Sequence, residues 1–230
     1  MKENDASLIY EKYKKEIDND DPEEYGLPFG YEADDMVKTF VILNDLIEKF
    51  IKSIKNGNTV VYNEFSLQHE LGIFLRNNKK RKVQFERNVS YFSQMNKSNF
   101  IKKEIDIAIF QDKKSPKIAI ELKYPRNGQY PEQMYSFCKD IMFIEQLIKN
   151  AGFKNTYLII LVDDKLFYEG KKTDGIYKYF RSTEKITGKI KKPTGKSSKD
   201  KIVINGEYSI NWKPIKENLK FAIIEAHLKN

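Results

Sequence analysis

Apolar residues recur along the chain with two different periods, and the change of period separates expected helices from expected strands. Where they recur every three to four positions, as on one face of a helix, they predict amphipathic helices. These helices are expected at 36–54, 63–76 (with Asn63 as the N-cap) and 131–150. Alternating or continuous apolar stretches predict strands instead. The strands are expected at 83–91, on both sides of a polar turn (111–116) within 102–125, and at 157–162.

The order strand, helix, strand over 118–162 predicts a right-handed crossover between parallel strands of a mixed sheet. Beyond residue 164 the pattern is less regular. There we expect a helical stretch at 174–180, a basic loop at 185–201, a hairpin at 202–210 with Asn205-Gly206 in its turn, and a strand or helix at 219–226. The fold class is therefore α/β, with a single domain over 35–230, a core at 63–162, a basic C-terminal part at 165–230 and a poorly ordered acidic arm at 1–34.

Composition narrows the class of protein. A single cysteine, Cys138, and two distant histidines argue against a disulfide framework and against a structural zinc site. No apolar run is long enough to span a bilayer and no signal pattern opens the chain, so we expect a cytoplasmic protein without membrane contact.

Charge is distributed unevenly. The net charge of +8 divides into −8 on residues 1–36 and +16 on the remainder. A strongly basic surface indicates a polyanionic partner, and nucleic acid is the commonest one. A genome that favours lysine codons would give a similar composition. The acidic arm either covers the basic surface in the absence of nucleic acid or serves as a solubilising tail.

The two central strands carry charges among their β-branched residues. Because side chains alternate across a strand, Glu104 and Asp106 share one face, as do Glu121 and Lys123. A symmetric antiparallel hairpin pairs Asp106 with Glu121 and Glu104 with Lys123. Two opposed carboxylates about 4.5–5.5 Å apart at Cβ repel unless a proton or a cation lies between them. A hard divalent cation such as Mg²⁺ prefers such oxygen ligands, whereas a solvated polar face is the plainer interpretation.

A third acid, Glu70, lies in the apolar stripe of the helix at 63–76, three residues after Leu67 and four before Phe74. A core-facing glutamate is costly unless it is paired or close to a cation. The alternative is a boundary residue whose carboxylate reaches solvent.

This ordered set resembles the PD-(D/E)XK nuclease superfamily, the fold of many restriction endonucleases. The resemblance covers about 63–162 and rests on Glu70, Asp106 and the "ELK" tripeptide with Glu121 and Lys123. "QMYSF" resembles the Gln-x-x-x-Tyr element of the RecB-like branch through Gln133, with Phe137 in place of Tyr. Ile105 stands where the family often has Pro, and Glu104 is an additional acid.

The resemblance implies a restriction endonuclease-like α/β fold and a Mg²⁺-dependent nuclease, with Mn²⁺ as a substitute. Asp106, Glu121, the Leu122 carbonyl and Glu70 would bind metal, and Lys123 would orient water or stabilise charge. DNA is the expected substrate, with RNA and a homodimer left open. Further phosphate-binding candidates are Arg76, Lys103, Arg126 and the lysines at 189–201. A nucleic-acid-binding protein without turnover and a metal-free scaffold are the alternatives.

Overall fold

The computed structural model describes residues 33–78, 82–93, 99–112, 117–126, 128–194 and 200–226, with the side chains of 33–42 and 78 excepted. The chain divides into two compact units, Met1–Lys52 and Ser53–Asn230, and the boundary falls inside helix α2 (Ala33–Lys55). The acidic arm expected at 1–34 lies almost wholly outside the described residues. Every residue of the candidate site described below belongs to the second unit.

The three helices expected from the apolar periodicity are confirmed. They are α2, α3 (Glu64–Asn78) and α4 (Tyr130–Ala151), followed by the short α5 (Lys178–Arg181). Asn63 caps α3, because its Oδ1 accepts a hydrogen bond from the Ser66 N–H at 2.8 Å. Helix α4 ends at Gly152, whose φ of 65° is the left-handed conformation typical of a C-terminal glycine. Among the described helices, none has the length and apolar character of a membrane span.

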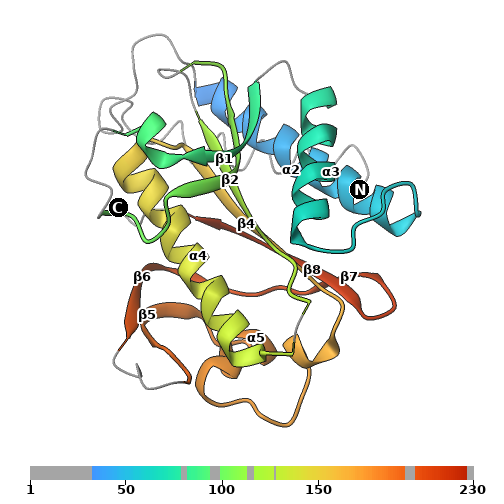
Figure 1. Cartoon of the computed structure of the whole chain (residues 1–230), viewed down its shortest axis with the longest axis vertical. Coiled ribbons are helices and arrows are strands. Elements are labelled where there is room, and N and C mark those ends of the chain that lie inside the picture. Colours follow the sequence, from blue (N-terminus) through green and yellow to red (C-terminus); the bar gives the residue numbers. More distant parts are fainter. Residues whose placement is uncertain are drawn as a thin grey trace. The chain divides into compact units, whose positions relative to one another are not determined.

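A mixed sheet of six strands forms the centre of the second unit (Figure 1). Its strands are β1 (Lys82–Asn88), β2 (Glu104–Phe110), β3 (Ile118–Lys123), β4 (Asn155–Val162), β7 (Lys213–Lys216) and β8 (Leu219–Ala226). They lie in the order β1-β2-β3-β4-β8-β7; β3 and β4 are parallel, and all other neighbours are antiparallel. The α/β class, the mixed sheet and the parallel pair joined by α4 are as the sequence predicts.

The register of the central hairpin is also as predicted. Ile107 pairs with Ile120 and Ala108 with Ala119, which brings Asp106 and Glu121 to the next position. The ladder of paired residues ends at Ile107 and Ile120, one position before Asp106 and Glu121. Glu104 pairs with Asn88 of β1, and its expected pairing with Lys123 does not form.

Helix α4 is buried on more than one side. Met134, Phe137 and Ile144 pack in a cluster with residues of β4, β8 and a second, two-stranded sheet. Phe143 and Leu147, on another side of the helix, pack with residues of β2, β3 and the segment after α4. Figure 1 shows α4 beginning near α5 and running up past the strands of the six-stranded sheet, and α4 also contacts β6 of the two-stranded sheet.

The two-stranded sheet corrects the prediction for residues 202–210. These residues form no hairpin of their own; β6 (Lys201–Tyr208) is one continuous strand paired with β5 (Ile186–Lys191). The N–H groups of Asn205 and Gly206 donate to the buried Glu145 carboxylate of α4 at 3.0 and 2.7 Å. A Cβ at Gly206 would lie 2.5 Å from Tyr208 Oη, so glycine serves close packing here and not a turn.

The other C-terminal segments, 174–180, 185–201 and 219–226, contain both helix and strand. Residues 219–226 form strand β8, the first of the two alternatives. A 3₁₀ turn at Gly175–Tyr177 and α5 account for the helical stretch expected at 174–180. The basic segment 185–201 is partly strand, and 195–199 lie outside the described residues.

Candidate active site

Two carboxylates converge where β2 and β3 separate. The Asp106 N–H donates to Glu121 Oε1 at 3.2 Å, and the Leu122 N–H donates to Asp106 Oδ2 at 2.7 Å. Backbone-to-side-chain bonds thus continue the pairing after the last ladder pair. The Glu121 side chain is fully buried and that of Asp106 is 15% exposed. Their approach is built into the backbone, because each carboxylate is fixed by a main-chain N–H of the opposite strand.

A lysine lies among these acids. The Lys102 ammonium forms an ion pair with Glu121 Oε2, lies 3.1 Å from Asp140 Oδ1 and lies 3.9 Å from Asp106 Oδ1. Asp140 comes from α4 and its side chain is 3% exposed. Three buried or nearly buried carboxylates from β2, β3 and α4 therefore surround one cation.

The second lysine, Lys123, lies on the other side of Asp140. Its Nζ is 3.4 Å from Asp140 Oδ2, and it donates to Glu64 Oε1 at 3.0 Å and to the Leu122 carbonyl at 3.0 Å. Glu64, in the first turn of α3, also accepts the Tyr124 N–H through Oε2 at 3.2 Å. Glu64 and Asp140 thus hold Lys123 from two helices.

Gln68 supports Asp106 from the side of α3. Its Nε2 donates to the Asp106 carbonyl at 2.8 Å and to Glu86 Oε1 at 2.6 Å. Glu86 has a φ of 47°, a left-handed conformation that is unusual for a non-glycine residue in a strand, and the β1–β2 register skips it. The Gln68 amide therefore bonds to the Asp106 carbonyl at a point where the ladder is interrupted, which fixes the Asp106 backbone.

The charges of the site shift one another's protonation. Burial raises the pKa of Asp106 to about 6, although Lys102 and Lys123 oppose this. Burial also raises the pKa of Glu121 well above its ordinary value, and the adjacent Asp106 adds to the effect. Burial lowers the pKa of Lys102, but Glu121, Asp140 and Asp106 outweigh it, so the pKa lies above its ordinary value. Both carboxyls hold protons more tightly than in water, the behaviour of acids removed from solvent.

The structure brings Asp106, Glu121, Lys123 and the Leu122 carbonyl together, as the sequence suggests, but it places Glu70 elsewhere. The Glu70 carboxylate is 3.5 Å from His69 Nδ1 and its side chain is 40% exposed. The reason is the phase of α3. Its buried stripe runs through Leu67, Leu71 and Leu75, with Gln68 beside it, which leaves Glu70 at the margin. The α3 acid that contacts Lys123 is Glu64.

The other candidates have separate environments. Gln133 lies two turns before Asp140 on α4, and Phe137 between them is fully buried in the core. Arg76 donates to the Val83 carbonyl at 3.2 Å, Arg126 forms an ion pair with Asp163, and Lys103 is exposed. Arg76 and Arg126 thus already have partners within the chain.

Sequence reasoning missed Lys102, Asp140 and Glu64, although two of them carried a signal. Asp140 lies three residues after Phe137 and four before Ile144, inside the apolar stripe of its helix. The argument that singled out Glu70 applies equally to Asp140. Lys102 is four positions before Asp106, so an extended chain would place both side chains on the same face. Glu64 has only the ordinary signature of an acid at a helix N-terminus.

The chain matches no family model, no curated protein and no solved structure. Among the described residues, no three Asp, Glu, His or Cys side chains form a ready-made metal-binding group. Asp140 Oδ2 is buried and accepts no hydrogen bond within the described part of the chain. In the described part of the chain, four carboxyl groups, of Glu64, Asp106, Glu121 and Asp140, face two ammonium groups, so acids outnumber cations in the site. Such a donor set fits a hard divalent cation.

Proposed function

We propose that this protein is a divalent-metal-dependent nuclease that hydrolyses phosphodiester bonds in DNA, with a restriction endonuclease-like core of the PD-(D/E)XK type. The observation that carries the proposal is the convergence of Asp106 and Glu121 at the end of the β2–β3 ladder, with Lys123 beside them. The resemblance described above assigns this Asp, Glu and Lys set to metal-assisted phosphodiester hydrolysis.

Mg²⁺ is the expected cation, with Mn²⁺ as a substitute. Asp106 and Glu121 would hold it, and Asp140, whose Oδ1 lies 3.1 Å from Lys102 Nζ and whose Oδ2 lies 3.4 Å from Lys123 Nζ, is close enough to contribute. When bound, such an ion supplies charge neutralisation at the phosphate and activates water. The raised pKa of both carboxyls supports this assignment, because a divalent cation replaces the proton or the ammonium that the acids otherwise require.

Lys123 is the cation proposed to act on the substrate. Glu64 and Asp140 keep its pKa above the ordinary value although burial lowers it, so it stays an ammonium at neutral pH. A permanent ammonium stabilises charge that develops on a phosphate and orients water, whereas a general base would need a lowered pKa. Gln68 and Glu64 act as positioning residues, the first for the Asp106 backbone and the second for Lys123.

One observation favours a second candidate, a nucleic-acid-binding protein of the same fold that does not cleave. The Lys102 ammonium already pairs with Glu121 and Asp140, so the acids are partly neutralised without metal. If Lys102 does not give way to a divalent cation, the fold would bind DNA without turnover. Cleavage therefore separates the two candidates.

The test is incubation with circular and linear DNA and with RNA, in the presence of Mg²⁺ or Mn²⁺. Asp106→Asn and Glu121→Gln should each lower the cleavage rate by about a hundredfold or more. Their affinity for DNA should be equal or higher, because each removes a negative charge. Glu104→Gln is the matched control, since Glu104 is an exposed acid on the same strand. Cleavage by Asp106→Asn at the rate of Glu104→Gln would refute the assignment.

A further inference from the structure

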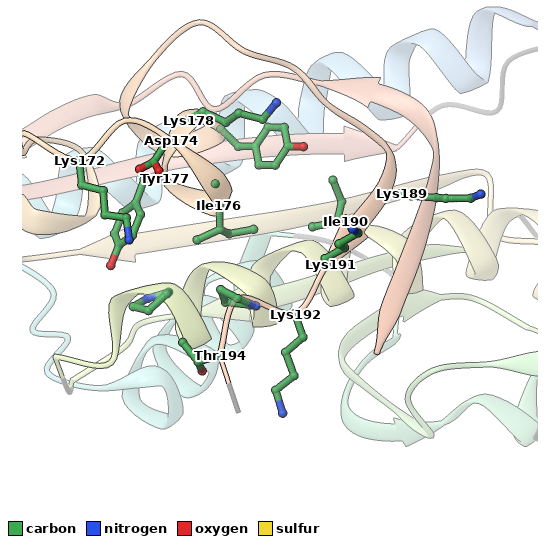
Figure 2. Close-up of a pocket in the computed structure, with 14 residues that line it drawn as sticks. Lys172, Asp174, Ile176, Tyr177, Lys178, Lys189, Ile190, Lys191, Lys192 and Thr194 are labelled. Carbon is green, nitrogen blue, oxygen red and sulfur yellow. The ribbon is translucent and has the colours of Figure 1, made fainter. Parts of the chain in front are cut away.

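A hollow of about 350 Å³ opens between the segment around η4 (Gly175–Tyr177) and strand β5 (Figure 2). Five lysines line it, which we call the lysine rim: Lys172, Lys178, Lys189, Lys191 and Lys192. Among the described residues that line it, Asp174 is the one acid. The hollow therefore carries a surplus of four positive charges on described residues.

The floor of this hollow is apolar. Ile176 and Ile190 are buried, at 6% and 2% exposure, and both line it. Figure 2 shows Lys172 with Asp174 and Tyr177 at one side, Ile176 in the middle, and the lysines of β5 at the other side. An apolar floor with a basic rim suits a nucleotide, whose base is apolar on its faces and whose phosphate is an anion. The volume lies within the range of about 300–1,000 Å³ for pockets that hold small ligands.

Tyrosine rings position two of the rim lysines. Lys172 Nζ lies 5.2 Å from the centre of the Tyr177 ring, and Lys178 Nζ lies 4.9 Å from that of Tyr179. Both distances are within the range of a cation–π contact. Both rings also line the hollow, and the Tyr177 ring additionally carries the Arg181 guanidinium at 4.2 Å, so the rings hold cations at this surface.

A second hollow, of about 410 Å³, borders the lysine rim. Lys192 lines both hollows. The second is also lined by Ile101 and Lys139, which directly precede Lys102 and Asp140 in the chain. The second hollow thus has Lys192 in common with the lysine rim and the chain neighbours of Lys102 and Asp140 among its lining residues.

The two-stranded sheet is fixed to the helix that carries Asp140. Glu145 of α4 accepts hydrogen bonds from the Gly206 N–H at 2.7 Å, the Tyr208 hydroxyl at 3.0 Å and the Asn205 N–H. A buried carboxylate with several donors is costly to separate from them. Lys189 and Lys191, on the strand paired with β6, are therefore held at a constant position relative to Asp140.

We infer that the lysine rim is a binding site for a single-stranded segment of nucleic acid that continues from the candidate active site, with its phosphates at the lysines and a base over the apolar floor. The inference rests on the proposed function for the identity of the ligand. It adds a site that the acids do not require, and it narrows the substrate to nucleic acid with an unpaired segment. Duplex alone would use the rim charges but not the floor.

The test is fluorescence anisotropy of a short labelled oligodeoxynucleotide, single-stranded or duplex, with the full-length protein in EDTA. The rim variant is Lys172→Gln/Lys189→Gln/Lys191→Gln. The matched control removes the same charge from three exposed lysines elsewhere, Lys55→Gln/Lys149→Gln/Lys216→Gln. The rim variant should lose about tenfold or more in affinity for the single strand, and its log–log salt slope should become shallower by about 2, since each phosphate contact contributes about 0.7. The control should lose about twofold or less, because distant charges are screened.

Three results would overturn the inference: no single-strand binding by the wild type, equal losses in the rim and control variants, or equal losses of the rim variant on single strand and duplex. Cleavage is measured separately with Mn²⁺. If the wild type does not cleave but shows rim-dependent single-strand binding, the proposed nuclease function fails and the lysine rim stands. If the wild type cleaves DNA and the rim variant binds the single strand like the control variant, the proposed nuclease function stands and the inference about the lysine rim fails.

Discussion

Lys102 offers a direct perturbation of the candidate active site. Replacing it by methionine keeps the length and apolar stem of the side chain but removes the charge. Asp106, Glu121 and Asp140 then lose the cation that, among the described residues, contacts all three. Lys123 remains, at 3.4 Å from Asp140. We expect Lys102→Met to destabilise the metal-free protein and to increase its response to a divalent cation.

The magnitude follows from the burial of the partners. Removing one member of a buried ion pair costs about 3–5 kcal/mol, because the remaining charge is left without a partner. Lys102 is 29% exposed, and protonation of Glu121 relieves part of the cost, so we take about 2–3 kcal/mol as the expected loss. For a protein of this size that is a fall in Tm of roughly 4–12 °C.

The measurement is thermal or urea unfolding at neutral pH in EDTA, repeated with saturating Mg²⁺ or Mn²⁺. A cation that binds only the folded state raises its stability by mass action. The gain should be larger in Lys102→Met than in the wild type, because the metal no longer competes with an ammonium. Lys103→Met is the matched control, since Lys103 is the exposed neighbour of Lys102.

Two results would refute this reasoning. If Lys102→Met and Lys103→Met unfold alike in EDTA, the Lys102 ammonium does not neutralise the acids. If the metal stabilises Lys102→Met no more than the wild type, the cation binds away from Lys102 and its carboxylates. The combination of a large loss in EDTA with an unusually large recovery in metal is what the geometry requires.

Two further predictions concern Gln68 and Glu225. Gln68→Ala should lower the maximal cleavage rate by about tenfold with little change in KM. It should also lower the stability by about 1–2 kcal/mol, because the partly buried Asp106 carbonyl loses its donor. A rate equal to that of His69→Ala, an exposed neighbour, would contradict this. Burial raises the pKa of Glu225 from 4.5 to about 7, so the folded state binds its proton more tightly, and stability should fall as the pH rises between these values. Glu225→Gln should remove that fall, so above pH 7 its free energy of unfolding in urea should exceed that of the wild type by up to about 3 kcal/mol. Below pH 4.5 the two proteins should be equally stable. A difference in stability that is constant with pH would contradict the assignment.

The hairpin and its acids could be predicted because the information is local. The polar turn and the alternation of apolar residues fix which residues face each other, and a slip of one residue would turn the whole apolar face outward. The pairing of Ile107 with Ile120 follows, and with it the approach of Asp106 to Glu121.

The choice between Glu64 and Glu70 could not be made in this way. Both lie beside apolar positions of α3, and the phase of the helix is set by its partner strand. A Cβ at Gly72 would lie 2.0 Å from the Phe85 ring of β1, so this glycine lets α3 approach β1 closely. That approach directs Gln68 toward Asp106 and leaves Glu70 beside His69. Helical periodicity predicts which residues of α3 form the apolar stripe, but it does not predict which strand packs against that stripe.

The hairpin turn predicted at Asn205-Gly206 was wrong for a related reason. The dipeptide is a strong local turn signal, but its N–H groups bond instead to the carboxylate of Glu145, 60 residues earlier. A buried carboxylate that accepts backbone N–H groups outweighs a turn propensity, because leaving it without donors costs more than an extended Asn-Gly. A distant buried acid of this kind has no signature in the sequence around the dipeptide.

Helix α4 links the two sites that the structure suggests. Asp140 and Glu145 are five residues apart, which places their side chains about 140° apart around the helix axis. One of them contacts Lys102 and Lys123, and the other holds β6 beside the lysine rim. Because the two contacts use different sides of one rigid element, substitutions in the lysine rim should change nucleic-acid affinity and its salt dependence without changing the response to metal. Substitutions of the acids should change the response to metal and leave the affinity for nucleic acid equal or higher, and a rim variant that also changed the response to metal would indicate that α4 itself had moved.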